Sequence, residues 1–285
     1  MPRGAAALNL AKAWFLAVVL ATVFGSLGWA IGGPTTALLF VFCALLAAMG
    51  FYRYGDAALL GMLGARPFAL AEDPGLRSMV DTVAARLGVR PPRLYLVDDG
   101  FPRVFVVGRG PMSSTLALST GALEALRRDE LEAIVAHELA HVLRRDVLVQ
   151  TFVVLFAATL VEASRLGGWF SRALLYVLAP IAAAFVHVLL SPKRELAADE
   201  LAARATGGAH DLADALLRLD HASELVAFAA SAATEPLYAV DPFEGEGIAR
   251  MFKTHPPLAG RINRLRELGG GANGRGPADV AVPQP

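Results

Sequence analysis

Two long apolar runs near the start of the chain form its strongest pattern. Residues 13–32 and 35–52 are almost wholly apolar, and each run is long enough for a membrane-spanning helix. The turn Gly32-Gly33-Pro34 joins them, which predicts a transmembrane hairpin. A cleaved signal peptide ending near Ala30 is the alternative for the first run, but the second run argues against it.

Basic residues flank this hairpin on both sides. Arg3 and Lys12 precede the first run, and Arg53 follows the second. Positively charged flanks remain in the cytoplasm, so the pattern predicts a multi-pass protein of the cell (inner) membrane whose chain ends face the cytoplasm.

A second apolar region lies later in the chain. Residues 147–161 are short for a span and contain Gln150, whereas residues 169–190 are longer and contain Pro180. They predict a second hydrophobic hairpin around Gly167-Gly168. Arg165 and Arg172 would then lie at its outer tip, which the positive-inside rule disfavours, so a buried or partly inserted helical pair is the alternative.

Shorter periodic segments surround this second region. Residues 57–68 could form an amphipathic segment along the membrane surface, and Asp73-Pro74 opens a helix that ends at Gly88. Three β-like runs, at 93–97, 104–107 and 115–119, predict a small sheet whose edge could align an extended peptide. Further helices are predicted at 121–128 and 210–225 and from Leu258 onward, with an irregular stretch at 226–247.

These patterns predict a mainly α fold with a small β-sheet and two hydrophobic helical hairpins, divided into five parts. They are an N-terminal transmembrane hairpin at 1–55, a first catalytic part at 56–146, the second hairpin at 147–190, a second catalytic part at 191–268 and a disordered Gly- and Pro-rich tail at 269–285.

Composition narrows the class of protein. The hydrophobic fraction of the 285 residues is 55 %, which is high for a soluble protein. The 26 basic and 26 acidic residues give a formal net charge of zero, so no nucleic-acid partner is indicated. The single cysteine, Cys43, cannot form an intramolecular disulfide and reads as a small apolar residue.

A pair of histidines carries the candidate chemistry. Asp129 and Glu132 read as a capping box that opens an amphipathic helix. His137 and His141 lie four residues apart on it, so both imidazoles point the same way and can hold one cation. Glu138 projects beside them, where it can act as a base in the H-E-x-x-H arrangement of zinc peptidases.

Zinc needs a third protein ligand, and the best candidate follows the second apolar region. Glu195 and Asp199 lie four apart on a predicted helix with Pro192 at its start and Gly207 after its end. Glu195 could ligate Zn²⁺ while Asp199 holds the free ring N–H of a ligand histidine. A hairpin returns its ends to the same side, so His141 and Glu195 would meet at the cytoplasmic membrane surface.

Three segments together resemble the HtpX-like membrane zinc metallopeptidases, a group related to the CAAX prenyl proteases. They are 128–141 (RDELEAIVAHELAH), 191–199 (SPKRELAAD) and 254–258 (THPPL). The resemblance extends from the first hairpin to about residue 268. It implies a gluzincin-like fold with one Zn²⁺ per chain, bound by His137, His141 and Glu195, and with Glu138 as base.

The same resemblance implies further residues and partners. His255 would lie near the oxyanion. Without the resemblance, the sequence shows only a histidine before two prolines, which fits a turn equally well. Relatives carry an Asn-Ala-Phe/Tyr stretch that contacts substrate; here Arg103 occupies the asparagine position, where it could contact substrate or the oxyanion. The implied partners are a protein or peptide substrate, drawn from misfolded membrane proteins or other proteins, and the lipid bilayer, with a homo-oligomer as one arrangement.

Two other functions fit parts of the sequence. A catalytically silent membrane scaffold with a structural zinc would be consistent with the replaced asparagine, but it would need a fourth protein ligand. A transporter or channel component would need ionisable groups inside its spans, and only Glu162 and His187 are candidates.

Overall fold

The computed structural model describes residues 3–69, 73–163, 168, 171–225, 232–239 and 251–272. This part of the chain is mainly helical with one small sheet, as the sequence predicts. Its elements, in order, are α1 (Arg3–Met62), β1 (Ala65–Pro67), α2 (Pro74–Leu87), β2 (Arg93–Val97), β3 (Val104–Gly110), β4 (Ser113–Ser119), α3 (Thr120–Ala125), α4 (Arg128–Arg144), α5 (Asp146–Ala163), α6 (Ser171–Leu189), α7 (Lys193–Thr206), α8 (Ala209–Leu225), the 3₁₀ helix η2 (Ala232–Leu237) and α9 (Leu258–Ala272).

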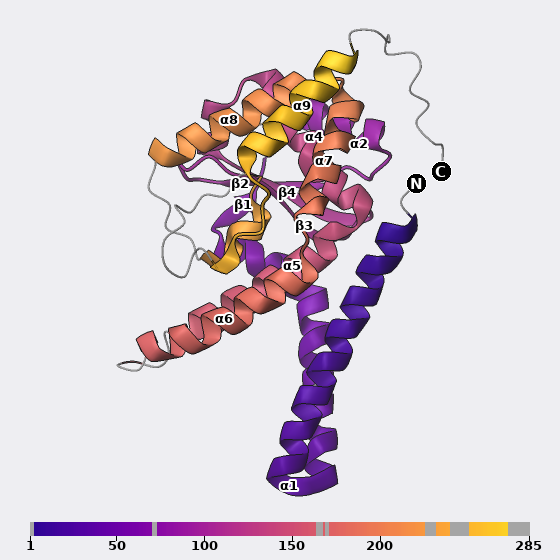
Figure 1. Ribbon diagram of the computed structural model, residues 1–285, viewed down its shortest axis with the longest axis vertical. Coiled ribbons are helices and arrows are strands. Elements are labelled where there is room, and N and C mark those ends of the chain that lie inside the picture. Colours follow the sequence, from indigo (N-terminus) through magenta and orange to yellow (C-terminus); the bar gives the residue numbers. More distant parts are fainter. Residues whose placement is uncertain are drawn as a thin grey trace.

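The long element α1 is a helical hairpin that projects away from the rest of the molecule (Figure 1). Its backbone leaves the helical region at Gly32 and at Gly33, where φ is +74°, a left-handed conformation that favours glycine. The two arms approach closely at Gly28, because a Cβ there would lie 2.7 Å from the carbonyl oxygen of Thr36. The predicted hairpin and its turn are therefore present.

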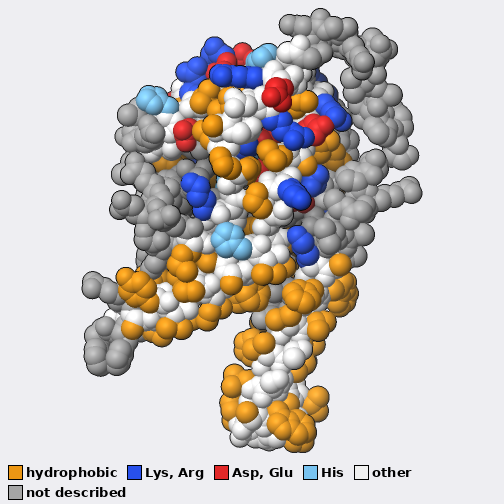
Figure 2. Space-filling model, in the orientation of Figure 1, with side chains coloured by type: hydrophobic (Ala, Val, Ile, Leu, Met, Phe, Trp, Pro, Cys, Tyr) orange, Lys and Arg blue, Asp and Glu red, His pale blue; other side chains and the backbone are white. Residues whose placement is uncertain are grey.

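Apolar side chains cover the outside of α1. The segment Ala21–Met62 is long and apolar enough to cross a membrane, and its most apolar stretch is not buried against the protein. The chain thus carries at least one membrane-crossing helix. Figure 2 shows apolar side chains over α1 and along the lower edge of α6, whereas charged side chains gather at the opposite end, over α8 and α9.

The second apolar region is only partly exposed. Helix α5 packs against α1, α6, β3 and η2, and its residues Val153, Val154 and Ala157 are buried. Small residues of α6 pack against α5, whereas other apolar side chains of α6, including Tyr176 and Val177, are exposed. The axis bends by 50° between α6 and α7, and α7 packs against α4 rather than continuing outward. The predicted turn of this pair lies largely outside the described residues.

The sheet is mixed and has the strand order β1-β2-β4-β3. Strand β2 runs parallel to β4, whereas β1 and β3 pair antiparallel at the two edges. Three of the four strands lie at the predicted positions. The prediction of an amphipathic surface segment at 57–68 is wrong, because α1 continues to Met62 with Leu59 and Leu60 buried and the chain then forms β1.

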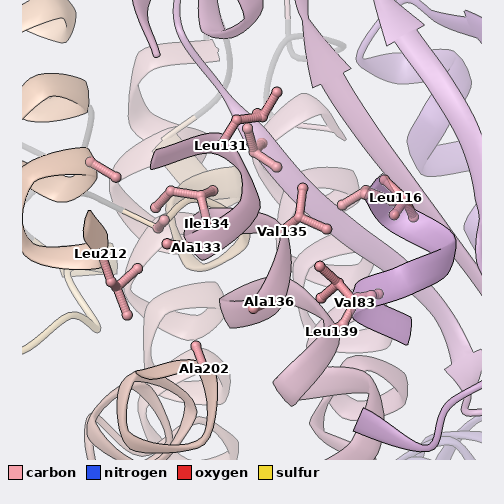
Figure 3. Packing of buried hydrophobic residues seen from close by; sticks show 14 of the residues in the cluster. Val83, Leu116, Leu131, Ala133, Ile134, Val135, Ala136, Leu139, Ala202 and Leu212 are labelled. Carbon is pink, nitrogen blue, oxygen red and sulfur yellow. The ribbon is translucent and has the colours of Figure 1, made fainter. Parts of the chain in front are cut away.

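Helix α4 lies at the centre of the largest hydrophobic core. Figure 3 shows Ile134, Val135 and Leu139 of α4 packed among apolar side chains of α2, β4, α7 and α8. Helix α2 has the predicted bounds, capped by the Asp73 side chain and ended by Gly88 in the left-handed region. Helix α9 runs to Ala272, so the predicted tail does not begin at residue 269, and residues 273–285 lie outside the described part.

Candidate metal centre

The helix that carries both histidines begins earlier than the sequence predicts. The expected box of Asp129 and Glu132 is wrong: Arg127 is the N-cap, and its N–H donates to Glu130 Oε2 at 2.8 Å. Glu130, which is fully buried, accepts this hydrogen bond at the third position of the helix. Glu132 instead forms an ion pair with Arg86.

Three donor side chains converge between α4 and α7. His137, His141 and Glu195 are buried, and each offers one ligand atom within 4.8 Å of the others. The Nε2 atoms of both histidines face the same carboxylate, at 3.4 Å from His137 to Oε2 and 3.6 Å from His141 to Oε1. The spacing of four residues on α4 aligns the rings, and the packing of α7 against α4 brings the carboxylate to them.

These separations fit a tetrahedral metal ion. Ligand bonds near 2.1 Å place neighbouring donors of a tetrahedral zinc site about 3.4 Å apart. The His137 Nε2 atom is buried and has no hydrogen-bond partner among the described residues, which a ligand to an ion would resolve. Two imidazoles and one carboxylate make a buried metal-binding triad typical of zinc peptidases.

The other ring nitrogens face carboxylates. His137 Nδ1 lies 2.9 Å from Asp199 Oδ1, and His141 Nδ1 lies 3.4 Å from Asp146 Oδ2. Asp146 reaches this position because α4 ends at Arg145 in a left-handed conformation (φ 62°) and α5 starts in a new direction. Such carboxylates fix the tautomer and ring orientation of ligand histidines.

Two buried arginines hold the acidic residues in place. Arg261 Nε and Nη2 donate to Asp199 Oδ2 and Oδ1 at 2.8 and 2.7 Å, and Arg194 Nε lies 3.1 Å from Glu195 Oε1. No sequence motif singles out Asp146, Arg194 or Arg261 as part of the site. Arg194 precedes Glu195 directly and was the easiest to suspect, whereas the role of Arg261 depends on the distant helix α9.

The charges of the cluster shift the pKa values of its members. Burial opposes the charged form of His141, but Glu195 and Asp146 outweigh it and raise its pKa to about 9. Burial likewise opposes ionisation of Asp199, yet Arg261 and His137 lower its pKa to about 2. Burial raises the pKa of Glu138 to about 7, because the nearby histidines only partly counteract it.

Glu138 and His255 lie at this cluster, and Arg103 makes other contacts. Glu138 Oε2 is buried without a hydrogen-bond partner among the described residues. His255 Nε2 lies 3.7 Å from Glu195 Oε2, so the Thr254–Leu258 segment reaches the site. The Arg103 guanidinium pairs with Asp99 and is also a partner of the Tyr238 hydroxyl.

The fold and the cluster define a metallopeptidase centre of the zinc type, and comparison with known proteins agrees. The model of "Peptidase family M48" matches residues 70–269, which include every residue of the cluster. The chain belongs to peptidase family M48, among its HtpX homologues, and is a zinc metallopeptidase.

Relatives of similar length support this membership. The chain is 36 % identical over 279 residues to a "Protease HtpX homolog" of Pelotomaculum thermopropionicum, covering 92 % of this chain and 99 % of that protein. It is 33 % identical to another from Pyrococcus abyssi, covering 89 % and 93 %. The crystal structure of S. mikatae Ste24p shares the fold with a TM-score of 0.50 at 17 % identity, over 92 % of this chain and 66 % of that chain.

Proposed function

We propose that this chain is a membrane-bound endopeptidase that cleaves misfolded membrane proteins or other proteins at the cytoplasmic face. One Zn²⁺ per chain would be held by His137, His141 and Glu195. The observation that carries the proposal is the convergence of these three buried donors beside the unpartnered carboxyl oxygen of Glu138.

The chemistry divides between the ion and the chain. Zn²⁺, when bound, lowers the pKa of water toward about 7 and polarises a carbonyl group. Glu138 acts as the general base, taking the proton of the attacking water and passing it to the leaving amine. Burial raises the pKa of the Glu138 carboxyl, which makes it a stronger base toward the attacking water.

Three further residues have supporting roles in this proposal. Asp199 holds the His137 ring through Nδ1 and fixes its tautomer. His255, beside Glu195, donates a hydrogen bond to the developing oxyanion. Arg103 is the proposed substrate contact, and its ion pair with Asp99 would hold the side chain in position.

The proposed membrane arrangement follows from the apolar surfaces. The α1 hairpin would insert as residues 1–55, and α5 with α6, within 147–190, would lie partly inserted with the exposed face of α6 toward lipid. The catalytic part would comprise 56–146 and 191–268. Lys12 and Arg53, which flank the apolar stretches of α1, support a cytoplasmic position for this part. The small number of spans favours quality control over processing of prenylated proteins.

A catalytically silent scaffold is the competing function. A structural zinc site is closed by a fourth protein ligand. Within the described residues the cluster has three His, Cys, Asp or Glu donors, which leaves a position open for substrate. This favours the peptidase.

The test compares Glu138→Gln with wild type in the full chain. The variant should keep stoichiometric zinc, because Glu138 is not a ligand, and should lose casein cleavage by about 100-fold or more. Metal analysis and cleavage of labelled casein in detergent measure both. Undiminished cleavage by a zinc-loaded variant would remove Glu138 from the mechanism.

A further inference from the structure

A small basic pocket lies where α1 leaves its exposed apolar stretch and enters the catalytic part. Apolar side chains on the second arm are exposed through Leu46 and Met49, and Leu59 and Leu60 are buried in the protein. Between them, Tyr52 and Tyr54 are 49 % and 63 % exposed. Tyrosines are enriched at membrane–water boundaries, so this stretch marks the level of the lipid headgroups.

The pocket has a volume of 160 Å³ and combines α1 with three strands. Its polar lining includes Arg53 and Asp56 from α1, Arg93 from β2, Arg109 from β3 and Ser113 from β4. Arg93 Nη2 lies 3.0 Å from the Asp56 carboxylate. The lining thus carries three guanidinium groups but one carboxylate, which pairs with Arg93, so the pocket has an excess of positive charge.

The two uncompensated arginines are held by aromatic rings. The Arg109 guanidinium lies 5.6 Å from the centre of the Tyr52 ring, and that of Arg53 lies 5.2 Å from the Tyr54 ring. Arg109 Nη2 donates to Ser113 Oγ at 3.3 Å, but its buried Nε has no hydrogen-bond partner among the described residues. Cation–π contacts position a guanidinium without neutralising it, so its remaining N–H groups can donate to an anion.

We propose that this pocket binds the phosphate group of an anionic phospholipid such as phosphatidylglycerol. The planar guanidinium group of arginine matches the geometry of phosphate oxygens. Sites for drug-sized ligands have volumes of about 300–1,000 Å³, and the smaller volume of this pocket suits a single phosphate group. The lipid source follows from position, because acyl chains can run along the exposed face at Leu46 and Met49. The inference rests on the membrane crossing of α1 and does not involve the zinc chemistry.

The test measures binding of a fluorescent phosphatidylglycerol to the full chain in a neutral detergent. Unlabelled phosphatidylglycerol should displace the probe at a concentration about tenfold or more below that needed for phosphatidylcholine. The variant Arg53→Gln/Arg109→Gln should bind the probe about tenfold or more weakly, as expected for the loss of two basic groups near a lipid surface. The matched control Arg264→Gln/Arg266→Gln removes two exposed charges from α9, far from α1, and should bind as wild type does.

A third variant acts in the opposite direction, although it removes the charge of the Arg93–Asp56 ion pair. Asp56→Asn removes the one carboxylate of the pocket while its side-chain oxygen can still accept from the Ala57 N–H, so probe affinity should rise severalfold. Equal affinity for both lipids, or equal losses in the two double variants, would overturn the proposal. Displacement of the probe by millimolar orthophosphate would also overturn it, by identifying a site for soluble phosphate. Zinc content is measured in parallel, so failure of the peptidase proposal is recognised separately.

Discussion

At the scale of single residues, the metal centre depends on pairs of buried charges. Each ligand histidine turns Nε2 toward Glu195 and Nδ1 toward its own aspartate. Asp199 in turn is held by two hydrogen bonds from Arg261, which is 1 % exposed. Arg261 therefore acts through Asp199 on the orientation of His137 and is a positioning residue.

Replacement of Arg261 should weaken metal binding. Arg261→Gln removes the two parallel hydrogen bonds that hold Asp199. We expect zinc affinity to fall by about 10–100-fold, which is typical when a residue that supports a ligand histidine is replaced. Competition with a chromophoric chelator measures this. Arg261→Lys should give an intermediate loss, because it keeps the charge but not the two parallel bonds. Exposed Arg264 on the same helix provides the control, Arg264→Gln, and equal affinities in both glutamine variants would contradict the positioning role.

The sequence predicted part of this centre. The H-E-x-x-H motif on a predicted helix indicates His137 and His141. The helical spacing of Glu195 and Asp199 and their place after the second apolar region indicate Glu195, and the structure brings all three donors together. Asp146 and Arg261 could not be predicted. Asp146 depends on the left-handed break at Arg145, a conformation rare outside glycine, and Arg261 depends on how α9 packs against α7.

At the scale of elements, the α1 hairpin depends on close approach of its arms. Small residues allow membrane helices to pack backbone to backbone, and Gly28 meets the Thr36 carbonyl and Ala37 Cα in this way. A Cβ at Gly50, on the second arm, would meet nothing within 4 Å.

This contrast gives a matched pair of substitutions. Gly28→Ala should separate the arms and destabilise the hairpin by about 1–3 kcal/mol, the usual cost of overpacking. Gly50→Ala should leave stability unchanged or slightly raised, because alanine favours a helix. Unfolding by SDS in mixed micelles compares the two, and similar midpoints for both variants would show that the arms do not touch at Gly28.

Element boundaries were predictable where a local signal marks them. Asp73 and Gly88 delimit α2, and Gly207 ends α7. The sequence did not reveal β1, because three residues carry no periodicity and β1 is a strand only through pairing with β2. It also could not decide how far α5 is buried, since apolar residues suit both lipid and a protein interior.

At the scale of the whole molecule, the proposed ion would join two parts of the chain. Its ligands belong to α4 and α7, and α5 and α6 lie between these in sequence. Binding to the folded state alone stabilises a protein by mass action.

Zinc removal should therefore lower the thermal stability of the whole catalytic part. At free zinc about 1,000 times the dissociation constant, binding contributes about 4 kcal/mol, which a chelator abolishes. Thermal unfolding in detergent, with and without chelator, measures the change. Glu195→Gln should show little response to the chelator, and a wild-type response no larger than that of the variant would argue against the His-His-Glu site.

The position of α5 and α6 between the two halves of the cluster also has a consequence for synthesis. A nascent chain that has reached only α6 already contains both histidines but still lacks Glu195. It cannot assemble the triad until α7 has left the ribosome, by which time α1 has been available to the insertion machinery for most of translation. We therefore expect proteolytic activity to arise only after α7 has been synthesised, when the hairpin α1 has long been exposed to the insertion machinery.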